Sequence, residues 1–384
     1  AGGDHTCGIA SGELYCWGYN SNEQLGINQK MNAESPVLIT SYEGWDSTSM
    51  NGSSGCGIIS SELYCWGRNN YGQIGDGTAS NRNVAVRIGS FSNWSVVSES
   101  GSHSCGIAGG KLYCWGLNTY GQLGNNSTTN RIAPILIGTR ADWSTASVGG
   151  SSSCAIASGE LYCWGYNAYG QLGDSTTVSR KVPARIGDRT DWVSVSLYSN
   201  HTCGIASGEL YCWGQNTYGK LGDNSEENKT VPTLIGDEVW EHISTGENHT
   251  CGIASGELYC WGNNQSRQLG DGSSTTSKEP VHIGVLSSWE KVSSGKSYTC
   301  GIESGRLFCW GSNSDGQLGN GGEGSYKSTP FQIGVMEDWT SITTGFYSAC
   351  GIVSGQMYCW GLNNVGQLGT GTAWSEVPIP VYLP

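Results

Sequence analysis

Short apolar stretches separated by turn residues recur along the whole chain. In the fifth such group they are 192–196, 201–206, 210–213 and 231–235, rich in aromatic and β-branched residues and bordered by Gly, Ser or Asn. Stretches of this length and composition predict β-strands. The three-and-four spacing of apolar residues that an amphipathic helix requires is missing, so a helical solenoid is not expected.

These strand groups form an internal repeat with a spacing of 48 to 50 residues between the first cysteines of successive groups. The chain divides into eight repeats: 1–49, 50–98, 99–147, 148–196, 197–244, 245–293, 294–343 and 344–384. Four strands in about 40 to 50 residues is the period of a propeller blade. We therefore expect an all-β fold in which residues 1–384 form a single eight-bladed β-propeller of four-stranded antiparallel blades.

The two ends of the chain are expected to close this ring. A strand that begins with Trp occurs seven times, and the first repeat has no copy of it: Trp45, Trp94, Trp143, Trp192, Trp240, Trp289 and Trp339. The last repeat ends with a strand around 377–381. We expect that strand to pair with the N-terminal hairpin, so that one blade is built from both chain ends and its fourth strand is absent or lies outside this sequence.

Each repeat has two cysteines nine positions apart, on either side of a two-residue turn such as Ser11-Gly12. This turn places Cys7 opposite Cys16 at a non-hydrogen-bonded position, where Cα atoms lie ~4.5 Å apart, within the ~4.4 to 6.8 Å that a disulfide tolerates. Zinc sites, which need four ligands at shorter spacing, fit poorly, and reduced buried thiols are the remaining alternative. We predict eight cross-strand disulfides: Cys7–Cys16, Cys56–Cys65, Cys105–Cys114, Cys154–Cys163, Cys203–Cys212, Cys251–Cys260, Cys300–Cys309 and Cys350–Cys359.

Disulfides persist in oxidising surroundings, so a secreted, extracellular protein is expected. Eight possible glycosylation sequons agree with this location: Asn51, Asn93, Asn125, Asn126, Asn200, Asn228, Asn248 and Asn264. Glycosylation itself depends on the organism.

Composition excludes several function classes. Glycine accounts for 60 of 384 residues, charged residues for only 13%, and the formal net charge is −13. Without a basic stripe or tail, nucleic acid is not an expected partner. No apolar run approaches the ~20 residues of a membrane span, and no N-terminal segment resembles a signal peptide. We expect a soluble chain from which any export signal has been removed.

The repeated motif resembles a known family. Residues 5–18, His-Thr-Cys-Gly-Ile-Ala-Ser-Gly-Glu-Leu-Tyr-Cys-Trp-Gly, and segments such as 121–124, Gly-Gln-Leu-Gly, are similar to the regulator of chromosome condensation repeat, and the likeness covers the entire chain. The resemblance implies a β-propeller, usually of seven blades, whose members share a scaffold and not an activity. They include a nuclear exchange factor for a small GTPase, a plant ultraviolet photoreceptor and a bacterial inhibitor of β-lactamases.

Two of those family activities do not fit this chain. It has neither the basic tail nor room for the inserted wedge of the exchange factor, and it lacks the Gly-Trp-Arg-His-Thr run of the photoreceptor. Fifteen of the sixteen tryptophans occupy two repeating strand positions, which indicates packing. The inhibitor-like role, a rigid ring that presents loops to a partner, remains.

Polar residues that recur between repeats are expected to be scaffold. Four histidines precede the first cysteine of their repeats and are interpreted as structural hydrogen-bonding groups: His5, His103, His201 and His249. Four aspartates follow the Gly-Gln-Leu-Gly segment and are expected to form Asx turns, since calcium needs more converging oxygens: Asp76, Asp174, Asp223 and Asp271. No catalytic motif is present. We expect no enzymatic activity, no cofactor and no metal.

Function is therefore expected where the repeats differ. The loops before the hairpins and the segments after Gly-Gln-Leu-Gly, such as 224–229 and 323–327, vary most, and their Tyr, Asn and Ser suit contacts with a sugar or a protein. The candidate ligand-binding residues are Tyr198, Asn200, Lys296, Tyr298, Phe346 and Tyr347. We expect a recognition propeller that binds a glycan or protein partner through one ring face. The alternatives are a self-assembling component of an extracellular matrix or filament and an inhibitor of a secreted enzyme.

Overall fold

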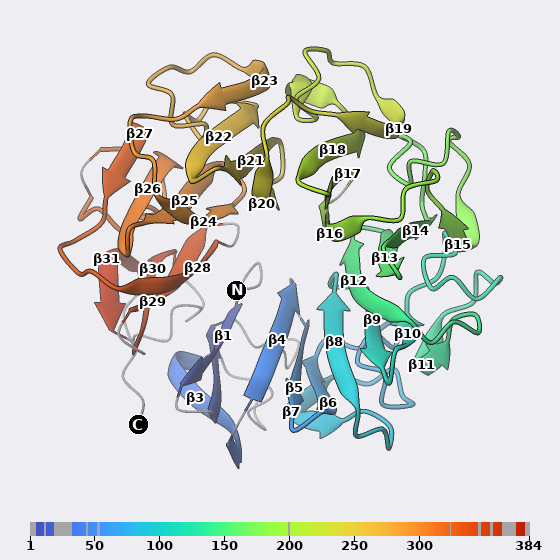
Figure 1. Ribbon diagram of the computed structural model, residues 1–384. Helices are drawn as coiled ribbons and strands as arrows, with labels where there is room; N and C mark the ends of the chain where they lie inside the picture. The colour runs from blue at the N-terminus through green and yellow to red at the C-terminus, as the bar shows by residue number, and fades with distance from the viewer. Residues whose placement is uncertain are drawn as a thin grey trace.

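The computed structural model consists of eight antiparallel β-sheets arranged around a ring (Figure 1). It describes residues 5–10, 13–18, 33–43, 45–51, 54–198, 200–322, 324–344, 347–353, 356–362 and 374–380. Within these residues there is one three-stranded sheet, and seven sheets have four strands each. The all-β propeller that the repeat predicts is confirmed.

The strands follow one another in chain order within every sheet, and the first strand of each four-stranded sheet lies nearest the ring centre (Figure 1). Sheets 1 to 4 contain β1 His5–Ala10, β2 Glu13–Gly18 and β3 Ala33–Glu43; β4 Trp45–Asn51, β5 Ser54–Ile59, β6 Glu62–Gly67 and β7 Arg82–Arg87; β8 Trp94–Glu99, β9 His103–Ala108, β10 Lys111–Gly116 and β11 Arg131–Leu136; β12 Trp143–Gly149, β13 Ser152–Ala157, β14 Glu160–Gly165 and β15 Arg180–Arg185.

Sheets 5 to 8 repeat this plan, and a 3-10 turn, Thr217–Gly219, lies in the loop between β18 and β19. Their strands are β16 Trp192–Tyr198, β17 His201–Ala206, β18 Glu209–Gly214 and β19 Lys229–Leu234; β20 Trp240–Thr245, β21 His249–Ala254, β22 Glu257–Gly262 and β23 Ser277–His282; β24 Trp289–Ser294, β25 Tyr298–Glu303, β26 Arg306–Ser312 and β27 Tyr326–Gln332; β28 Trp339–Thr344, β29 Ser348–Val353, β30 Gln356–Leu362 and β31 Trp374–Pro380.

The expected exchange of strands between the chain ends is wrong. The last strand, β31, pairs with β30 of its own repeat, and the N-terminal hairpin pairs with β3 of its own repeat. A local strand reaches the outer edge of β2 at a smaller loop-closure cost than a strand from the far end of the chain. Among the described residues the first sheet has three strands and no Trp-bearing inner strand, and β1 contacts both β4 and β30.

Cross-strand disulfides are confirmed in six sheets. Each hairpin has the predicted two-residue turn register, and the Cα atoms of each bonded pair lie 4.1 Å apart. The bonds are Cys56–Cys65, Cys105–Cys114, Cys154–Cys163, Cys203–Cys212, Cys251–Cys260 and Cys300–Cys309. The backbone register also places Cys7 opposite Cys16 and Cys350 opposite Cys359. The side chains of Cys7, Cys350 and Cys359 lie outside the described residues.

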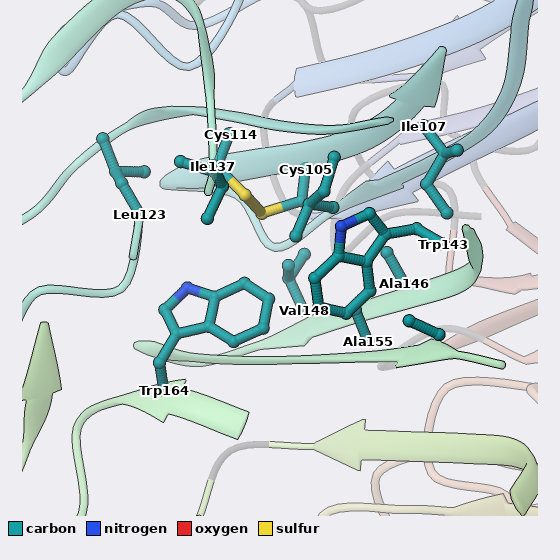
Figure 2. Packing of buried hydrophobic residues seen from close by; sticks show 12 residues of the cluster. Cys105, Ile107, Cys114, Leu123, Ile137, Trp143, Ala146, Val148, Ala155 and Trp164 are labelled. Carbon is teal, nitrogen blue, oxygen red and sulfur yellow. A yellow bond between two sulfur atoms is a disulfide. The ribbon is translucent and has the colours of Figure 1, made fainter. Parts of the chain in front are cut away.

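The hydrophobic core lies between consecutive sheets. In Figure 2 the Cys105–Cys114 disulfide of sheet 3 packs in one cluster with Trp143 and Trp164 of sheet 4. Both cysteines are fully buried, and the exposed fractions of the two indoles are 6% and 0%. Polarisable sulfur packs favourably against aromatic rings. Each disulfide therefore forms part of the contact surface for the next sheet as well as linking its own hairpin.

Hydroxyl groups near the ring centre add a second set of contacts between sheets. The Oγ of Ser98 on β8 accepts the backbone N–H of Val148 on β12 at 3.1 Å, and the Oγ of Ser244 on β20 accepts the N–H of Ser294 on β24 at 3.0 Å. Ser49 and Ser293 accept in the same way from Glu99 and Thr344. These bonds satisfy backbone donors of inner strands that have no neighbouring strand on that side.

Replacing Cys203 and Cys212 by alanine should lower the free energy of unfolding by about 2 to 3 kcal/mol, because the bond closes a short loop of the unfolded chain. Urea unfolding under non-reducing conditions measures this change. As a control, treatment with reductant during unfolding should destabilise the wild type more than the variant, which retains fewer disulfides. Identical urea midpoints for the wild type and the variant would contradict the assigned bond.

Candidate binding face

The two kinds of variable loop meet at the same end of each sheet whose loops the structure describes. Because the hairpin strands are antiparallel, the segment before the first strand and the segment after the second lie side by side. Backbone hydrogen bonds join them: the N–H of Gln215 donates to the carbonyl of Asn200, and that of Ser312 to the carbonyl of Ser297, at 2.9 and 3.0 Å. We call this end of the ring the loop face.

The structure brings several of the predicted ligand-binding residues together on the loop face. The Nζ of Lys296 donates to the Oη of Tyr347 on the next sheet at 2.7 Å and lies 4.9 Å from the centroid of its ring. Burial and the charge of Glu247 raise the pKa of Tyr198 to about 12. The Tyr347 hydroxyl, followed by the charge of Glu247, raises the pKa of Lys296. Tyr198, Glu247, Lys296 and Tyr347 come from four consecutive sheets, and we call them the polar arc.

The other predicted ligand-binding residues have different surroundings. Tyr298 is fully buried at the position that histidine occupies in sheets 3, 5 and 6, so its side chain packs in the interior and does not face a ligand. Asn200 is half-buried, with its carbonyl bonded to Gln215. Phe346 lies outside the described residues. Sequence reasoning missed Glu247, whose loop contains no aromatic residue.

A tyrosine cluster on the same face was also missed. Tyr120, from the loop after β10, lies 4.7 Å from Tyr166 between ring centroids, and Tyr166 lies 6.3 Å from Tyr169, both in the loop after β14. Tyr120 is 43% exposed. Tyr120 and Tyr169 recur just before Gly-Gln-Leu-Gly and therefore looked like scaffold in the sequence. Exposed tyrosines offer large contact area at little entropic cost.

The prediction that the recurring histidines are structural hydrogen-bonding groups is confirmed for His103 and His249, and it is wrong for His201, whose buried ring nitrogens have no hydrogen-bond partner. The Nδ1 of His103 lies 2.8 Å from the Oγ of Ser100, and its Nε2 lies 2.9 Å from the Oγ of Ser153 on the next sheet. The Nε2 of His249 makes the same contact with Thr299. Burial lowers the pKa of His103 and of His249 to about 3, so both rings are neutral. The side chain of His5 lies outside the described residues.

The predicted Asx turns are confirmed. An Oδ1 of each aspartate accepts the N–H of the residue two positions on, at 2.9 to 3.2 Å: Asp76 from Thr78, Asp174 from Thr176, Asp223 from Ser225 and Asp271 from Ser273. The Asp223 carboxylate also pairs with the Nζ of Lys229 at 2.8 Å. In the described part of the chain no group of three or more His, Cys, Asp or Glu side chains is placed to hold a metal ion.

The sequons differ in accessibility. Asn93, Asn126 and Asn228 are exposed, and Asn125, Asn200 and Asn248 are half-buried. Asn264 is fully buried and donates its amide to Asp271 at 2.9 Å, so it cannot accept a glycan in the folded protein. The side chain of Asn51 lies outside the described residues.

Crevices of about 350 and 470 Å³ separate neighbouring sheets on the outer side of the ring. One is lined by Arg189, Tyr211 and Val231, and the other by the equivalent Arg140, Tyr162 and Val182. The Arg189 guanidinium covers the ring of Tyr211 at 5.0 Å and pairs with Asp191 and Glu209 at 2.7 Å each. These two carboxylates neutralise the charge of the Arg189 guanidinium. No helix among the described residues is long and apolar enough to cross a membrane.

Lys220 is the main irregularity of the loop face. It occupies the position of the glutamine in Gly-Gln-Leu-Gly, and its side chain is 2% exposed. Burial lowers the pKa of its ammonium to about 8, against the opposing effect of Glu247.

Comparison with known proteins agrees with the fold. The family model described as "Regulator of chromosome condensation (RCC1) repeat" matches residues 11–53, 60–107, 109–156, 158–205, 207–253, 255–302, 304–351 and 354–384. A second model of the same description matches 192–220 and 240–268. None of the curated proteins compared with the chain matches it significantly.

Solved propellers are similar in structure at low sequence identity. Human WBSCR16 has a TM-score of 0.70 and 20% identity, covering 84% of this chain and 94% of its own. Prp20p from Saccharomyces cerevisiae, studied with its binding to Gsp1p and histones, has a TM-score of 0.70 and 18% identity, covering 88% and 91%. Yeast RCC1 (Prp20) with Kap60 bound gives 0.65 and 16%, covering 98% and 85%. At these identities the likeness shows the fold alone.

Lys220→Gln should make the protein more stable at pH 7 by about 3 kcal/mol, because the pKa of Lys220 lies roughly 2.5 units below its ordinary value. Between pH 8 and 10 the unfolded chain binds more protons than the folded one, so the free energy of unfolding of the wild type rises with pH and the advantage of the variant shrinks. Denaturant unfolding from pH 7 to 10 measures this. The exposed Lys181→Gln should keep the wild-type pH dependence. Parallel stability curves for wild type and Lys220→Gln would contradict the buried charge.

Proposed function

The chain belongs to the regulator of chromosome condensation (RCC1) repeat family, and from this premise we propose that it is a non-enzymatic binding protein that recognises a partner protein through its loop face. The polar arc is the observation that carries the proposal. Tyr198, Glu247, Lys296 and Tyr347 precede the hairpins of four consecutive sheets and differ in chemistry. A surface composed of unlike side chains suits one large partner better than several copies of one small ligand.

The division between fixed and variable positions supports this proposal. The repeated tryptophans, cysteines, histidines and aspartates are used in packing, disulfides and hydrogen bonds within the scaffold. The side chains left to vary gather on loops that a rigid ring holds in place, which is where binding residues concentrate in proteins.

The loop face is also asymmetric. Sheets 3 and 4 present small residues before their hairpins, Gly101 and Gly149-Gly150, whereas sheets 5 to 8 present the polar arc. The tyrosine cluster lies beyond the small residues, on the loops after β10 and β14. A protruding loop of the partner would rest on these small residues. It would then contact the tyrosine cluster on one side and the tyrosines of the polar arc on the other. Tyrosine is enriched among the residues that dominate binding energy at protein interfaces.

We place this activity outside the cell. The six disulfides lie in the hydrophobic core, and all twelve of their cysteines are fully buried. A scaffold that depends on these bonds requires an oxidising compartment for folding. The exposed sequons Asn93, Asn126 and Asn228 are compatible with passage through a secretory pathway.

The test screens the intact, oxidised chain against a panel of secreted proteins and against a glycan array. For a protein that binds, Tyr198→Ala combined with Lys296→Ala should weaken the affinity by roughly tenfold or more, since hot-spot truncations each cost more than ~1 kcal/mol. The matched control is Val182→Ala with Val231→Ala on the outer crevices, which should bind like the wild type.

Three other outcomes of this test would contradict recognition of a protein through the loop face. Equal loss in both double variants would remove the loop face from the binding site. Selective array binding that free sugar competes away would support a glycan-binding propeller. Absence of partners together with a sedimentation coefficient that grows with protein concentration would support self-assembly.

A further inference from the structure

The glutamine of Gly-Gln-Leu-Gly, and of its variants at 72–75 and 267–270, accepts the same two hydrogen bonds in five described loops. Its side-chain Oε1 accepts the backbone N–H of the residue two positions earlier, at 2.8 to 3.0 Å. Its carbonyl accepts the indole N–H of the next sheet's hairpin tryptophan. The five glutamines are Gln73, Gln122, Gln171, Gln268 and Gln317.

Lys220 keeps the backbone part of this arrangement and loses the side-chain part. Its carbonyl still accepts from Trp261 and Thr250 of sheet 6, at 3.0 and 2.9 Å. An ammonium cannot accept a hydrogen bond, so the N–H of Tyr218 has no equivalent of the glutamine oxygen. Tyr218 adopts φ of +66°, which is unfavourable for a bulky side chain. Backbone strain of this kind persists where the surroundings enforce it, often at ligand sites.

The Lys220 ammonium has few partners for a buried charge. Among the described residues its one hydrogen-bond acceptor is the Oε1 of Gln215 at 3.1 Å, and it forms no ion pair with a carboxylate there. Two of its three N–H groups are therefore unused. A buried charge that no carboxylate contacts directly costs several kcal/mol, which the arrival of an anion would relieve.

A second buried group at the same junction lacks partners. His201, on β17, is 1% exposed, and neither of its ring nitrogens has a hydrogen-bond partner. The equivalent His103 has a partner at each nitrogen. Burial, and after it the charge of Lys220, lower the pKa of His201, while the backbone of Tyr198 raises it; the ring is neutral and carries one N–H. The Nδ1 of His249 is also without a partner.

We propose that the junction between sheets 5 and 6 binds a small monovalent anion, of the size of chloride or formate, with the Lys220 ammonium and the His201 ring N–H as donors. Lys220 and His201 are 2% and 1% exposed, which restricts the ligand to an ion of a few atoms. One buried cation faced by the carboxylate of Glu247 favours a single negative charge over two. Bound anion would neutralise the charge at this junction and steady the loops that carry Tyr198 and Glu247. The site is separate from the proposed partner recognition and does not depend on it.

The test compares the Tm of the wild type and Lys220→Gln in sodium chloride, sodium formate and sodium gluconate at constant ionic strength. An ion that binds only the folded state raises Tm with its concentration. The wild type should be stabilised by chloride or formate relative to gluconate, and the relative response of the two small ions identifies the better ligand. Lys220→Gln, which restores the residue of five other junctions, should lose the specific response entirely.

The pH of the response provides an independent check. Near pH 10 the wild-type effect should disappear, because Lys220 has lost its proton while Tyr198 has not, and His201 and His249 are already neutral at pH 7. Bromide should also broaden the ⁸¹Br NMR signal less with Lys220→Gln than with the wild type. Equal salt responses of the two proteins, or a response to ionic strength alone, would overturn the proposal.

Discussion

The contact on which the ring depends is the convergence of two donors on one loop carbonyl. At each junction from sheet 2 to sheet 8, the indole N–H of a hairpin tryptophan reaches back to the carbonyl of the preceding sheet's Gly-Gln-Leu-Gly loop, or of its lysine variant, at 2.8 to 3.0 Å. At five of these junctions a serine or threonine hydroxyl donates to the same oxygen. Because all these groups are buried, leaving the carbonyl or the indole unpaired would cost far more than a surface bond. The apolar contact between the disulfide and the indoles can therefore form in only one position of the two sheets relative to each other.

This fixed junction explains how a chain with few charged residues can keep long loops ordered. In sheets 2 to 7, a buried asparagine holds the loop after the hairpin from inside. Asn118, for example, accepts the N–H of Leu123 and donates to the Oδ1 of Asn125 and to two carbonyls of the same loop. The loop then crosses to the next sheet, where the N–H of Asn126 donates to the carbonyl of Lys181. With its backbone held at both places, the remaining loop side chains can change without moving the scaffold, which separates stability from recognition.

The parts of the structure that depend on near neighbours in the chain could be read from the sequence. The hairpin register follows from its two-residue turn, the disulfides follow from that register, and the Asx turns at Asp174 and its equivalents involve residues two positions apart. The closing of the ring could not be read in the same way, since pairing β31 with the N-terminal hairpin or with β30 satisfies the same strand pattern. Candidate site residues failed where burial decided the role. Tyr298 and Tyr347 look alike in the sequence, yet one fills a histidine position in the interior and the other meets Lys296 on the surface.

Repeat architecture also explains why a costly residue can persist at one junction. Each sheet packs mainly against its two neighbours. The loss of stability caused by the buried charge of Lys220 is therefore confined to the contact between sheets 5 and 6, and the other junctions are unaffected. The six disulfides among the described residues add enough stability to offset one such departure. Departures from a scaffold's own rules are expected where function requires them. Here the buried charge, the strained Tyr218 and the unpaired His201 coincide at the place where the polar arc begins, because Tyr198 and Glu247 lie on the two sheets that this junction joins. The irregular junction and the variable surface therefore belong to one region of the ring.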